Sequence, residues 1–157
     1  KNKNENLNII NKVLKLYTES PILFKVEDEV FKRTLFDKDS ILITLRRDSR
    51  DLKIIGYAKG GPLEIYNLRQ GTFDQNLGRR NTAYLEGIGI DKQYWGETGG
   101  HILRLAFLAR ARKLGYKFVT GYAHREVINQ RIKKGEQIET VRKYDPDNLD
   151  YYRMTLT

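Results

Sequence analysis

The sequence predicts an α/β protein with a mixed, mostly antiparallel sheet flanked by helices, in a single domain that spans residues 1–157. Short runs of β-branched and aromatic residues alternate with segments of helical periodicity, which is typical of this class. A glycine-rich turn between one strand and a long helix is a second indication, and no linker divides the chain. Of the 157 residues, 39% are hydrophobic and 31% are charged, which suits a domain with one core of its own.

The N-terminal part predicts two helices. Residues 1–5 are polar, and we expect them to fray. Residues 22–36 are ambiguous, but their apolar spacing favours a helix, and acidic residues early with basic residues late suit its dipole. The first helix is predicted by apolar residues at helical spacing before a stop at Ser20-Pro21, namely Leu7, Ile10, Val13, Leu14 and Tyr17.

Two strands follow, and they predict an antiparallel hairpin. Residues 41–45 and 53–59 have strand character on either side of a polar turn at 46–51, and Gly60-Gly61-Pro62 ends the second strand. The next stretch, residues 64–81, has a weak pattern and several turn residues. A loop of that length is either functional or a disordered surface insertion, and the sequence leaves both interpretations open.

The centre of the chain predicts a third strand over residues 84–90, a glycine-rich turn over 93–100 and the main helix over 100–114, which ends at Gly115. We expect the outward side of this helix to carry Arg104, Arg110, Arg112 and Lys113. We expect its buried side to carry Leu103, Leu105, Ala106, Leu108, Ala109 and Leu114.

The C-terminal part predicts a strand, a helix and two more strands. Residues 117–123 have a strand pattern, and residues 125–134 form a shorter helix that ends at a glycine. Residues 137–144 and 151–156 alternate as strands do, and the turn at 145–148 separates them.

The central segment also predicts an anion site. A strand that leads into a glycine-rich loop and then a helix commonly holds a phosphate, because free N–H groups and the helix N-terminus attract negative charge. The formal net charge is +9, and residues 79–157 carry 15 basic and 9 acidic side chains. This balance suits a nucleotide cofactor or nucleic acid, although a solubilising surface would have the same charge.

The composition excludes several classes of site. The chain has no cysteine, which rules out disulfides and thiolate chemistry within it and is compatible with a cytoplasmic location. No apolar run reaches the roughly 20 residues that a membrane helix needs, so we expect no membrane partner. The two histidines lie 23 positions apart without an acidic cluster at ligand spacing, so we expect no metal site.

From about Ile41 to Leu156, the order of these elements resembles the GNAT superfamily of N-acetyltransferases. Residues 54–58 look like the second hairpin strand of that family, and residues 84–90 look like its central strand before the cofactor loop. Residues 109–116 are similar to the end of the helix that follows. The strand that normally begins the family is not visible in residues 1–5, so it is either missing here or the chain is the C-terminal part of a larger protein.

The resemblance implies acetyl-CoA as the cofactor. Counted from the strand, the loop motif of the family falls on Gln93 to Thr98. Counted back from the helix end, it falls on Trp95 to Gly100. This loop is therefore about two residues longer than is usual in the family. The cofactor-binding residues that the resemblance and the loop together predict are Ile88, Gly89, Ile90, Gln93, Trp95, Gly96, Glu97, Thr98, Gly99, Gly100, His101, His124 and Arg131.

The shorter helix at residues 125–134 and its flanking residues depart from the family pattern. His124 stands where the family often has Asn, Arg131 stands where it has Tyr, Lys133 matches its Lys, and Glu136 replaces its Phe. That Tyr often protonates the leaving thiolate. A guanidinium stays protonated and is a poor general acid, so we expect Arg131 to stabilise a thiolate or to bind a CoA phosphate.

Acetyl transfer to an amine requires a base, an oxyanion contact and an acid. Glu86 is the candidate base, directly or through water, unless it is only a salt-bridged strand residue. The backbone N–H groups of residues 88–90 would supply the oxyanion contact, and Gly87 and Gly89 suit a close ligand approach or simple packing against a helix. Tyr144 ranks first as the acid; the other candidates are Tyr122, Tyr151 and Tyr152.

The histidines have alternative interpretations. His101 at the helix start either bonds a phosphate or is simply solvated, and His124 is either a capping side chain or a functional one.

The leading function is therefore transfer of an acetyl group from acetyl-CoA to a primary amine, on a protein or a small molecule. A second interpretation is transfer of a longer acyl chain from an acyl carrier protein, whose acidic surface would suit the basic half of the chain. A third is a non-catalytic domain that binds CoA, a partner protein or nucleic acid. A homodimer is also left open.

Overall fold

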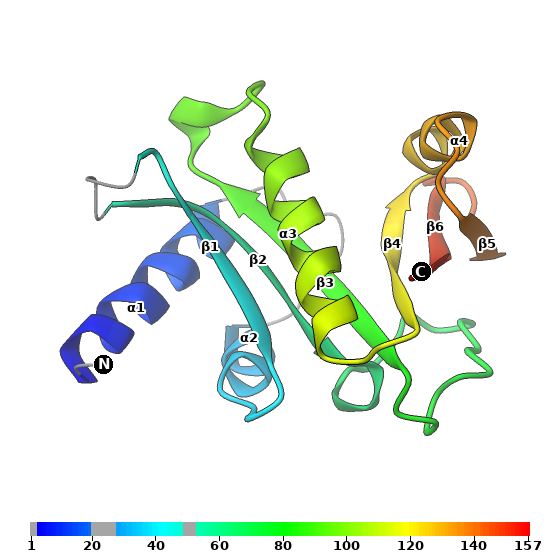
Figure 1. Ribbon diagram of the computed structural model, residues 1–157, viewed down its shortest axis with the longest axis horizontal. Helices are drawn as coiled ribbons and strands as arrows, with labels where there is room; N and C mark the ends of the chain where they lie inside the picture. The colour runs from blue at the N-terminus through cyan, green and yellow to red at the C-terminus, as the bar shows by residue number, and fades with distance from the viewer. Residues whose placement is uncertain (1–2, 20–27, 49–52) are drawn as a thin grey trace.

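The computed structural model describes residues 3–19, 28–48 and 53–157, and its main feature is a six-stranded sheet in the order β1-β2-β3-β4-β6-β5 (Figure 1). The strands are β1 (Ile41–Arg46), β2 (Ile54–Pro62), β3 (Thr82–Ile90), β4 (Phe118–His124), β5 (Ile138–Arg142) and β6 (Leu149–Thr155). The α-helices are α1 (Lys3–Glu19), α2 (Asp28–Leu35), α3 (Gly99–Lys113) and α4 (Arg125–Lys133).

Among the six strands of the described residues, only one neighbouring pair is parallel. β1–β2, β2–β3, β4–β6 and β5–β6 pair antiparallel, whereas β3 and β4 run in the same direction. Helix α3 connects β3 to β4, as a parallel connection requires. The predicted mixed, mostly antiparallel sheet and the β1–β2 hairpin are therefore confirmed.

The helices cover two faces of the sheet, which we call the α3 face and the α1 face. Helix α3 packs on β1, β2 and β3, and α4 packs on β4, β5 and β6, and their buried side chains share one core cluster. Helices α1 and α2 pack on the opposite face through a second cluster that includes Tyr17, Phe31 and Tyr57. Figure 1 shows α3 in front of the N-terminal strands and α1 behind them.

The buried side of α3 differs from the prediction. Leu103 and Leu108 are buried as expected, but Leu105 and Leu114 are each 48% exposed, and Phe107 and Ala111 take the buried positions. A Cβ on Gly60 would lie 2.6 Å from the Phe107 ring, so the glycine lets this ring reach the sheet. The prediction failed because α3 carries apolar residues on nearly every side, and periodicity alone cannot choose between them.

Arg104 is the second correction on α3. We expected it to point outward, and it is 4% exposed. Its guanidinium donates to the Glu136 carboxylate at 2.5 Å and lies 3.8 Å from the Met154 sulfur. The partner that makes this burial favourable comes from the segment after α4, which the sequence of α3 cannot indicate.

Two element boundaries also differ. Helix α1 begins at Lys3, within the stretch that we expected to fray, and β2 continues through Gly60–Pro62, where we expected an end. The predicted stop at Ser20-Pro21, the start of the ambiguous segment at 22–27 and part of the turn at 46–51 lie outside the described residues.

Residues 66–81, which we call the cross-loop, are not a disordered insertion. They follow a short 3-10 helix, η1 (Leu63–Ile65), and they bury Asp74 and Asn76. The Asp74 carboxylate accepts hydrogen bonds from Tyr151 at 2.6 Å and from Arg153 at 3.0 Å, both on β6. The cross-loop therefore connects the N-terminal half of the sheet to its C-terminal half.

Candidate functional site

The sheet opens between β3 and β4. Their parallel pairing covers only Thr82↔Phe118, Ala83↔Val119 and Tyr84↔Thr120. Beyond these pairs, β3 stays bonded to β2 as far as Ile90, and β4 stays bonded to β6 as far as His124, but the two strands no longer pair with each other. Figure 1 shows them diverging. We call this region, between residues 86–90 and 121–124, the sheet opening.

The glycine-rich helix start borders one side of the opening on the α3 face. Asp91 caps a short 3-10 helix, η2 (Lys92–Tyr94), by accepting from the N–H of Gln93, and α3 begins at Gly99. Thr98 precedes α3 without giving it a side-chain cap. The first N–H groups of α3 are therefore not satisfied by a capping side chain, and they form a suitable anion site.

A cavity of about 310 Å³ adjoins this helix start. The Trp95 indole N–H donates to the Ile90 carbonyl at 2.8 Å, which holds the ring beside β3. Gly96 has a φ of +83°, a backbone conformation that favours glycine. All of the residues that line the cavity were among the predicted cofactor contacts, namely Ile88, Ile90, Trp95, Gly96, Glu97, Gly100 and His101.

The remaining predicted loop residues lie around this cavity and not in its lining. A Cβ on Gly99 would lie 3.1 Å from the Leu45 side chain, so Gly99 packs α3 against β1. A Cβ on Gly89 would lie 2.4 Å from the Tyr57 ring on the α1 face. These two glycines therefore serve close packing, although Gly89 packs against the Tyr57 ring of β2 and not against a helix as the alternative interpretation had it. Their contact with a cofactor stays a prediction.

Glu86 lies at a β-bulge where the opening begins. Lys59 pairs with Gly87 and Gly60 pairs with Leu85, so Glu86 is an extra residue in β3. Its carboxylate forms an ion pair with the Lys59 ammonium, and their side chains are 8% and 0% exposed. The salt-bridged state of Glu86 is thus observed, and its catalytic role stays a prediction.

Burial and the ion pair act in opposite directions on these two groups. Burial raises the pKa of Glu86, while the Lys59 charge and hydrogen bond lower it; the net shift is upward. Burial likewise lowers the pKa of Lys59 against the opposing effect of Glu86. A raised pKa makes a carboxylate a stronger base, which suits Glu86 to accept a proton.

Tyr144 lies with the cross-loop. Its hydroxyl donates to the Gln70 carbonyl at 3.0 Å and bonds the Thr72 hydroxyl, and the Arg69 guanidinium lies 4.2 Å from its ring centroid. Two other tyrosines also fasten this loop. Tyr122 accepts from the Arg69 N–H at 2.8 Å, and Tyr151 donates to Asp74.

Tyr152 has a different position, on the α3 face beside β4. A Cβ on Gly121 would lie 3.1 Å from the Tyr152 hydroxyl and 3.0 Å from the Leu85 carbonyl oxygen, which places this hydroxyl next to the junction of β3 and β4. Tyr152 lies close enough to Arg131 of α4 for the two side chains to interact electrostatically. Burial and the neighbouring charge of Arg104 lower the pKa of Arg131. The Glu136 carboxylate pairs with Arg104, and its charge also acts on Arg131.

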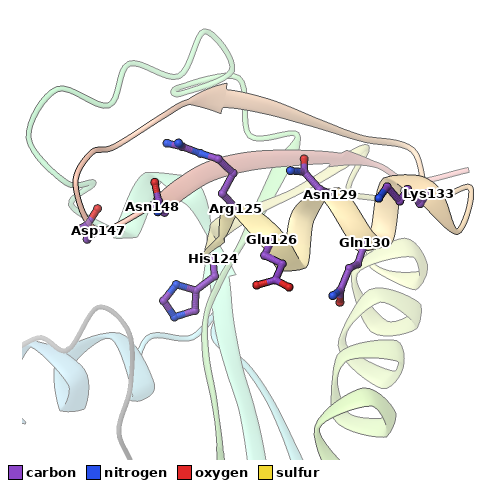
Figure 2. A pocket seen from close by; sticks show the side chains of 8 residues that line it. All are labelled: His124, Arg125, Glu126, Asn129, Gln130, Lys133, Asp147 and Asn148. Atoms are coloured by element: carbon purple, nitrogen blue, oxygen red, sulfur yellow. The ribbon is translucent and has the colours of Figure 1, made fainter.

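His124 occupies the N-cap position of α4 but its side chain makes no capping hydrogen bond, so its interpretation as a capping side chain is wrong. It is exposed and lines a second cavity, of about 550 Å³. Figure 2 shows His124, Glu126 and Gln130 projecting to one side of α4 and Arg125 to the other. Arg125 binds the buried Asp150 carboxylate with two hydrogen bonds, of 2.7 and 3.0 Å.

The structure therefore brings the predicted residues together only in part. The cavity residues and Arg131 lie on the α3 face, Glu86 lies on the α1 face, and Tyr144 is engaged by the cross-loop. Sequence reasoning missed Lys59 and the proximity of Tyr152 to Arg131. The signal for Lys59 was a charged residue directly after the uncharged run at residues 54–58 and within the same predicted strand.

No helix within residues 3–19, 28–48 and 53–157 is long and apolar enough to cross a membrane. Within the same ranges, no three His, Asp or Glu side chains gather as metal ligands.

Comparisons with solved structures identify the fold. Tetrahymena GCN5 has a TM-score of 0.65 at 13% identity, with 100% of this chain and 93% of that chain covered. An acetyltransferase of the GNAT family from Desulfovibrio desulfuricans, described as putative, has a TM-score of 0.60 at 17% identity, with 94% and 92% covered. The PaiA N-acetyltransferase of Thermoplasma acidophilum, solved with coenzyme A, has a TM-score of 0.51 at 16% identity, with 81% and 67% covered.

The chain thus has the GNAT fold, as the resemblance predicted. No family model matches the sequence, and no curated protein matches it.

Proposed function

We propose that this protein is an N-acetyltransferase that moves an acetyl group from acetyl-CoA to a primary amine. The observation that carries the proposal is the sheet opening with chemically different surroundings on its two faces. On the α3 face lie an uncapped helix start, a cavity and Arg131. On the α1 face lies the buried carboxylate of Glu86. The opening joins an anion-binding side to a proton-accepting side.

The α3 face fits the cofactor. The first N–H groups of α3 and the glycines before it suit a pyrophosphate, and Ile88, Ile90 and Trp95 supply apolar surface beside it. Acetyl-CoA supplies an acetyl thioester: the new C–N bond forms as the C–S bond breaks, and the thiolate then takes a proton. In this proposal the N–H groups of residues 88–90 stabilise the oxyanion.

Glu86 acts on the acceptor. An amine attacks only when it is neutral, so a group close to it must take its proton. Glu86 stands where β3 leaves β4 and has a raised pKa because it is buried. We therefore assign it the proton of the amine, directly or through one water.

For the acid we favour Tyr152 over Tyr144. The Tyr152 hydroxyl lies beside Gly121 at the opening. Burial raises the pKa of Tyr152, and the charge of Arg131 acts in the opposite direction. The Tyr144 hydroxyl is engaged by Gln70 and Thr72. We expect Tyr152→Phe to lower kcat at least tenfold and Tyr144→Phe to change it less than threefold; the reverse order would restore Tyr144 as the acid.

The proposal is tested with acetyl-CoA and a panel of protein and small-molecule amines, by following release of the free thiol. Glu86→Gln should lower turnover at least tenfold with little change in CoA affinity, and Glu126→Gln, an exposed carboxylate on α4, serves as the control. Thermal unfolding with acetyl-CoA at about 100 times its Kd should show about 2.7 kcal/mol of added stability. Absence of any shift at millimolar acetyl-CoA would refute the cofactor assignment.

A second candidate is transfer of a longer acyl chain from an acyl carrier protein. It is favoured by the exposed basic residues in the last turn of α3, Arg110, Arg112 and Lys113. Competition between acetyl-CoA and long-chain acyl donors separates the two reactions. Binding of CoA without turnover of any donor would leave a non-catalytic CoA-binding domain.

A further inference from the structure

We propose that Lys59 is a positioning residue for the proposed acyl transfer: its ammonium fixes the Glu86 carboxylate at the sheet opening and keeps it in the charged form that accepts a proton. This inference rests on the proposed function, because it assigns a role to Lys59 through Glu86. Lys59 contacts neither the acceptor nor the cofactor in this arrangement.

The backbone brings the two side chains to one face. Lys59 stands on β2 opposite Gly87, and the bulge inserts Glu86 between the paired positions Gly87 and Leu85 of β3. A side chain at a bulge is aimed differently from those of a regular strand. The Glu86 carboxylate therefore meets Lys59 on the α1 face, whereas Leu85 and Ile88 pack on the α3 face.

Lys59 is itself held from several directions. Its side chain is 0% exposed, and its ammonium donates to the Thr34 hydroxyl of α2 at 2.6 Å. The ammonium also lies 4.3 Å from the Phe31 ring centroid and 5.4 Å from that of Tyr66. A lysine side chain has several rotatable bonds, and these contacts fix them, so the position of the ammonium determines the position of the carboxylate.

The charge of Lys59 has no substitute near Glu86 among the described residues. The titratable groups that face this carboxylate are Lys59 and Tyr57 from β2, Tyr66 after η1, and Tyr84 from β3. Helix α2 contributes the hydroxyl of Thr34, which does not titrate. Burial, together with the Glu86 charge, raises the pKa of each of these tyrosines, so they stay neutral.

Loss of Lys59 should therefore leave a carboxylate that is almost buried and has no cation beside it. Such a group takes up a proton instead of remaining charged. A protonated Glu86 cannot accept the proton of the amine. The expected consequence is a base that is inactive at neutral pH although its own side chain is unchanged.

The test measures the titration of Glu86 by carbon NMR of protein labelled at the glutamate carboxyl carbon, with Glu86→Gln to assign the signal. In Lys59→Met we expect the pKa of Glu86 to rise by about 1–3 units, the size of effect that an adjacent opposite charge has. The acidic limb of kcat/KM should move up in pH by the same amount. Lys117→Met removes an exposed lysine and serves as the control.

A reciprocal measurement covers the case in which Lys59→Met does not fold. In Glu86→Gln the pKa of Lys59, followed by nitrogen NMR of its ammonium, should fall further, because the carboxylate that stabilises its charge is gone. An unchanged Lys59 titration would overturn the coupling.

The readouts separate the two proposals. If no amine is acetylated by the wild-type protein, the proposed function fails, while the NMR titrations still report on the pair. If the Glu86 signal moves in Lys59→Met but the acidic limb of kcat/KM stays in place, Lys59 is only structural and the positioning role is overturned.

Discussion

Asp74 and Arg153 lie 79 positions apart in the sequence and form a buried ion pair, with 3.0 Å between their carboxylate and guanidinium atoms. The other carboxylate oxygen of Asp74 accepts from the Tyr151 hydroxyl at 2.6 Å. The two side chains that bond this carboxylate, Tyr151 and Arg153, stand on β6, so a long loop without regular structure is fixed to a strand in the other half of the sheet.

We predict that Asp74→Ala lowers the free energy of unfolding by about 3 kcal/mol, because breaking a buried pair leaves the Arg153 charge with less compensation. Urea denaturation measures the change. Asp147→Ala is the matched control: its carboxylate pairs with Arg69 at 2.9 Å but is 46% exposed, and we expect a loss below about 1 kcal/mol. Equal losses in the two variants would show that the cross-loop is not fastened through Asp74.

Trp95 is the only tryptophan in the chain and lines the cavity at the start of α3, so its fluorescence reports on that cavity alone. The ring is 48% exposed, and a ligand that covers it changes its surroundings. We predict a saturable change in emission on addition of CoA. Trp95→Phe should lose the signal and retain heat of binding in calorimetry. Binding heat in the wild type without any emission change would place CoA elsewhere.

Arg131 should contribute to cofactor affinity, because its charge is only partly compensated beside Arg104. A charged hydrogen bond to an anionic group is worth about 1.5–3 kcal/mol, so we predict that Arg131→Gln weakens CoA binding at least tenfold by calorimetry. Arg112→Gln, an exposed guanidinium on α3, should leave the affinity within twofold of wild type. Equal affinities of wild type and Arg131→Gln would remove Arg131 from the cofactor site.

Asp150 should make stability depend on acid pH. Burial would raise the pKa of Asp150, but the hydrogen bonds from Arg125 and from the Tyr144 N–H, with the Arg125 charge, hold it below its usual value. A folded pKa below the unfolded one adds stability above the unfolded pKa, and this stability is lost as pH falls through the folded pKa.

Asp150→Asn should therefore be less stable than wild type at pH 7, and the difference should shrink as pH falls below the ordinary aspartate pKa of about 3.9. Thermal unfolding as a function of pH measures this. Asp145→Asn, whose carboxylate is 70% exposed, should track the wild type at every pH. A difference that stays constant across the acid range would contradict a lowered pKa for Asp150.

The elements of the fold could be predicted because their signals are local. Glycines end α3 and α4 with positive φ at Gly115 and Gly135, and alternation marks the strands. The buried side of α3 could not be predicted, because Leu105 and Phe107 are both apolar and only the tertiary partners decide between them. The burial of Arg104 likewise depends on Glu136, which lies 32 positions away.

The candidate site, like the fold, could be predicted from the sequence only in part. The residues around the cavity at Trp95 could be predicted because glycines, a strand end and a helix start are contiguous in sequence. The partner of Glu86 could not, because the bulge that aims it at Lys59 arises from the register between two strands. The engagement of Tyr144 by Gln70 and Thr72 was equally hidden, since the cross-loop has no periodic pattern.

The position of β6 between β4 and β5 has a consequence for how the chain acquires its structure. β6 follows both of its neighbours in sequence, and it carries the Tyr151 and Arg153 that hold Asp74. During synthesis, the cross-loop, β4 and β5 therefore leave the ribosome before β6, the strand that joins them. Contacts of such high sequence separation form slowly. The C-terminal half of the sheet should consequently assemble in one late step, after residue 155 is available, and not hairpin by hairpin.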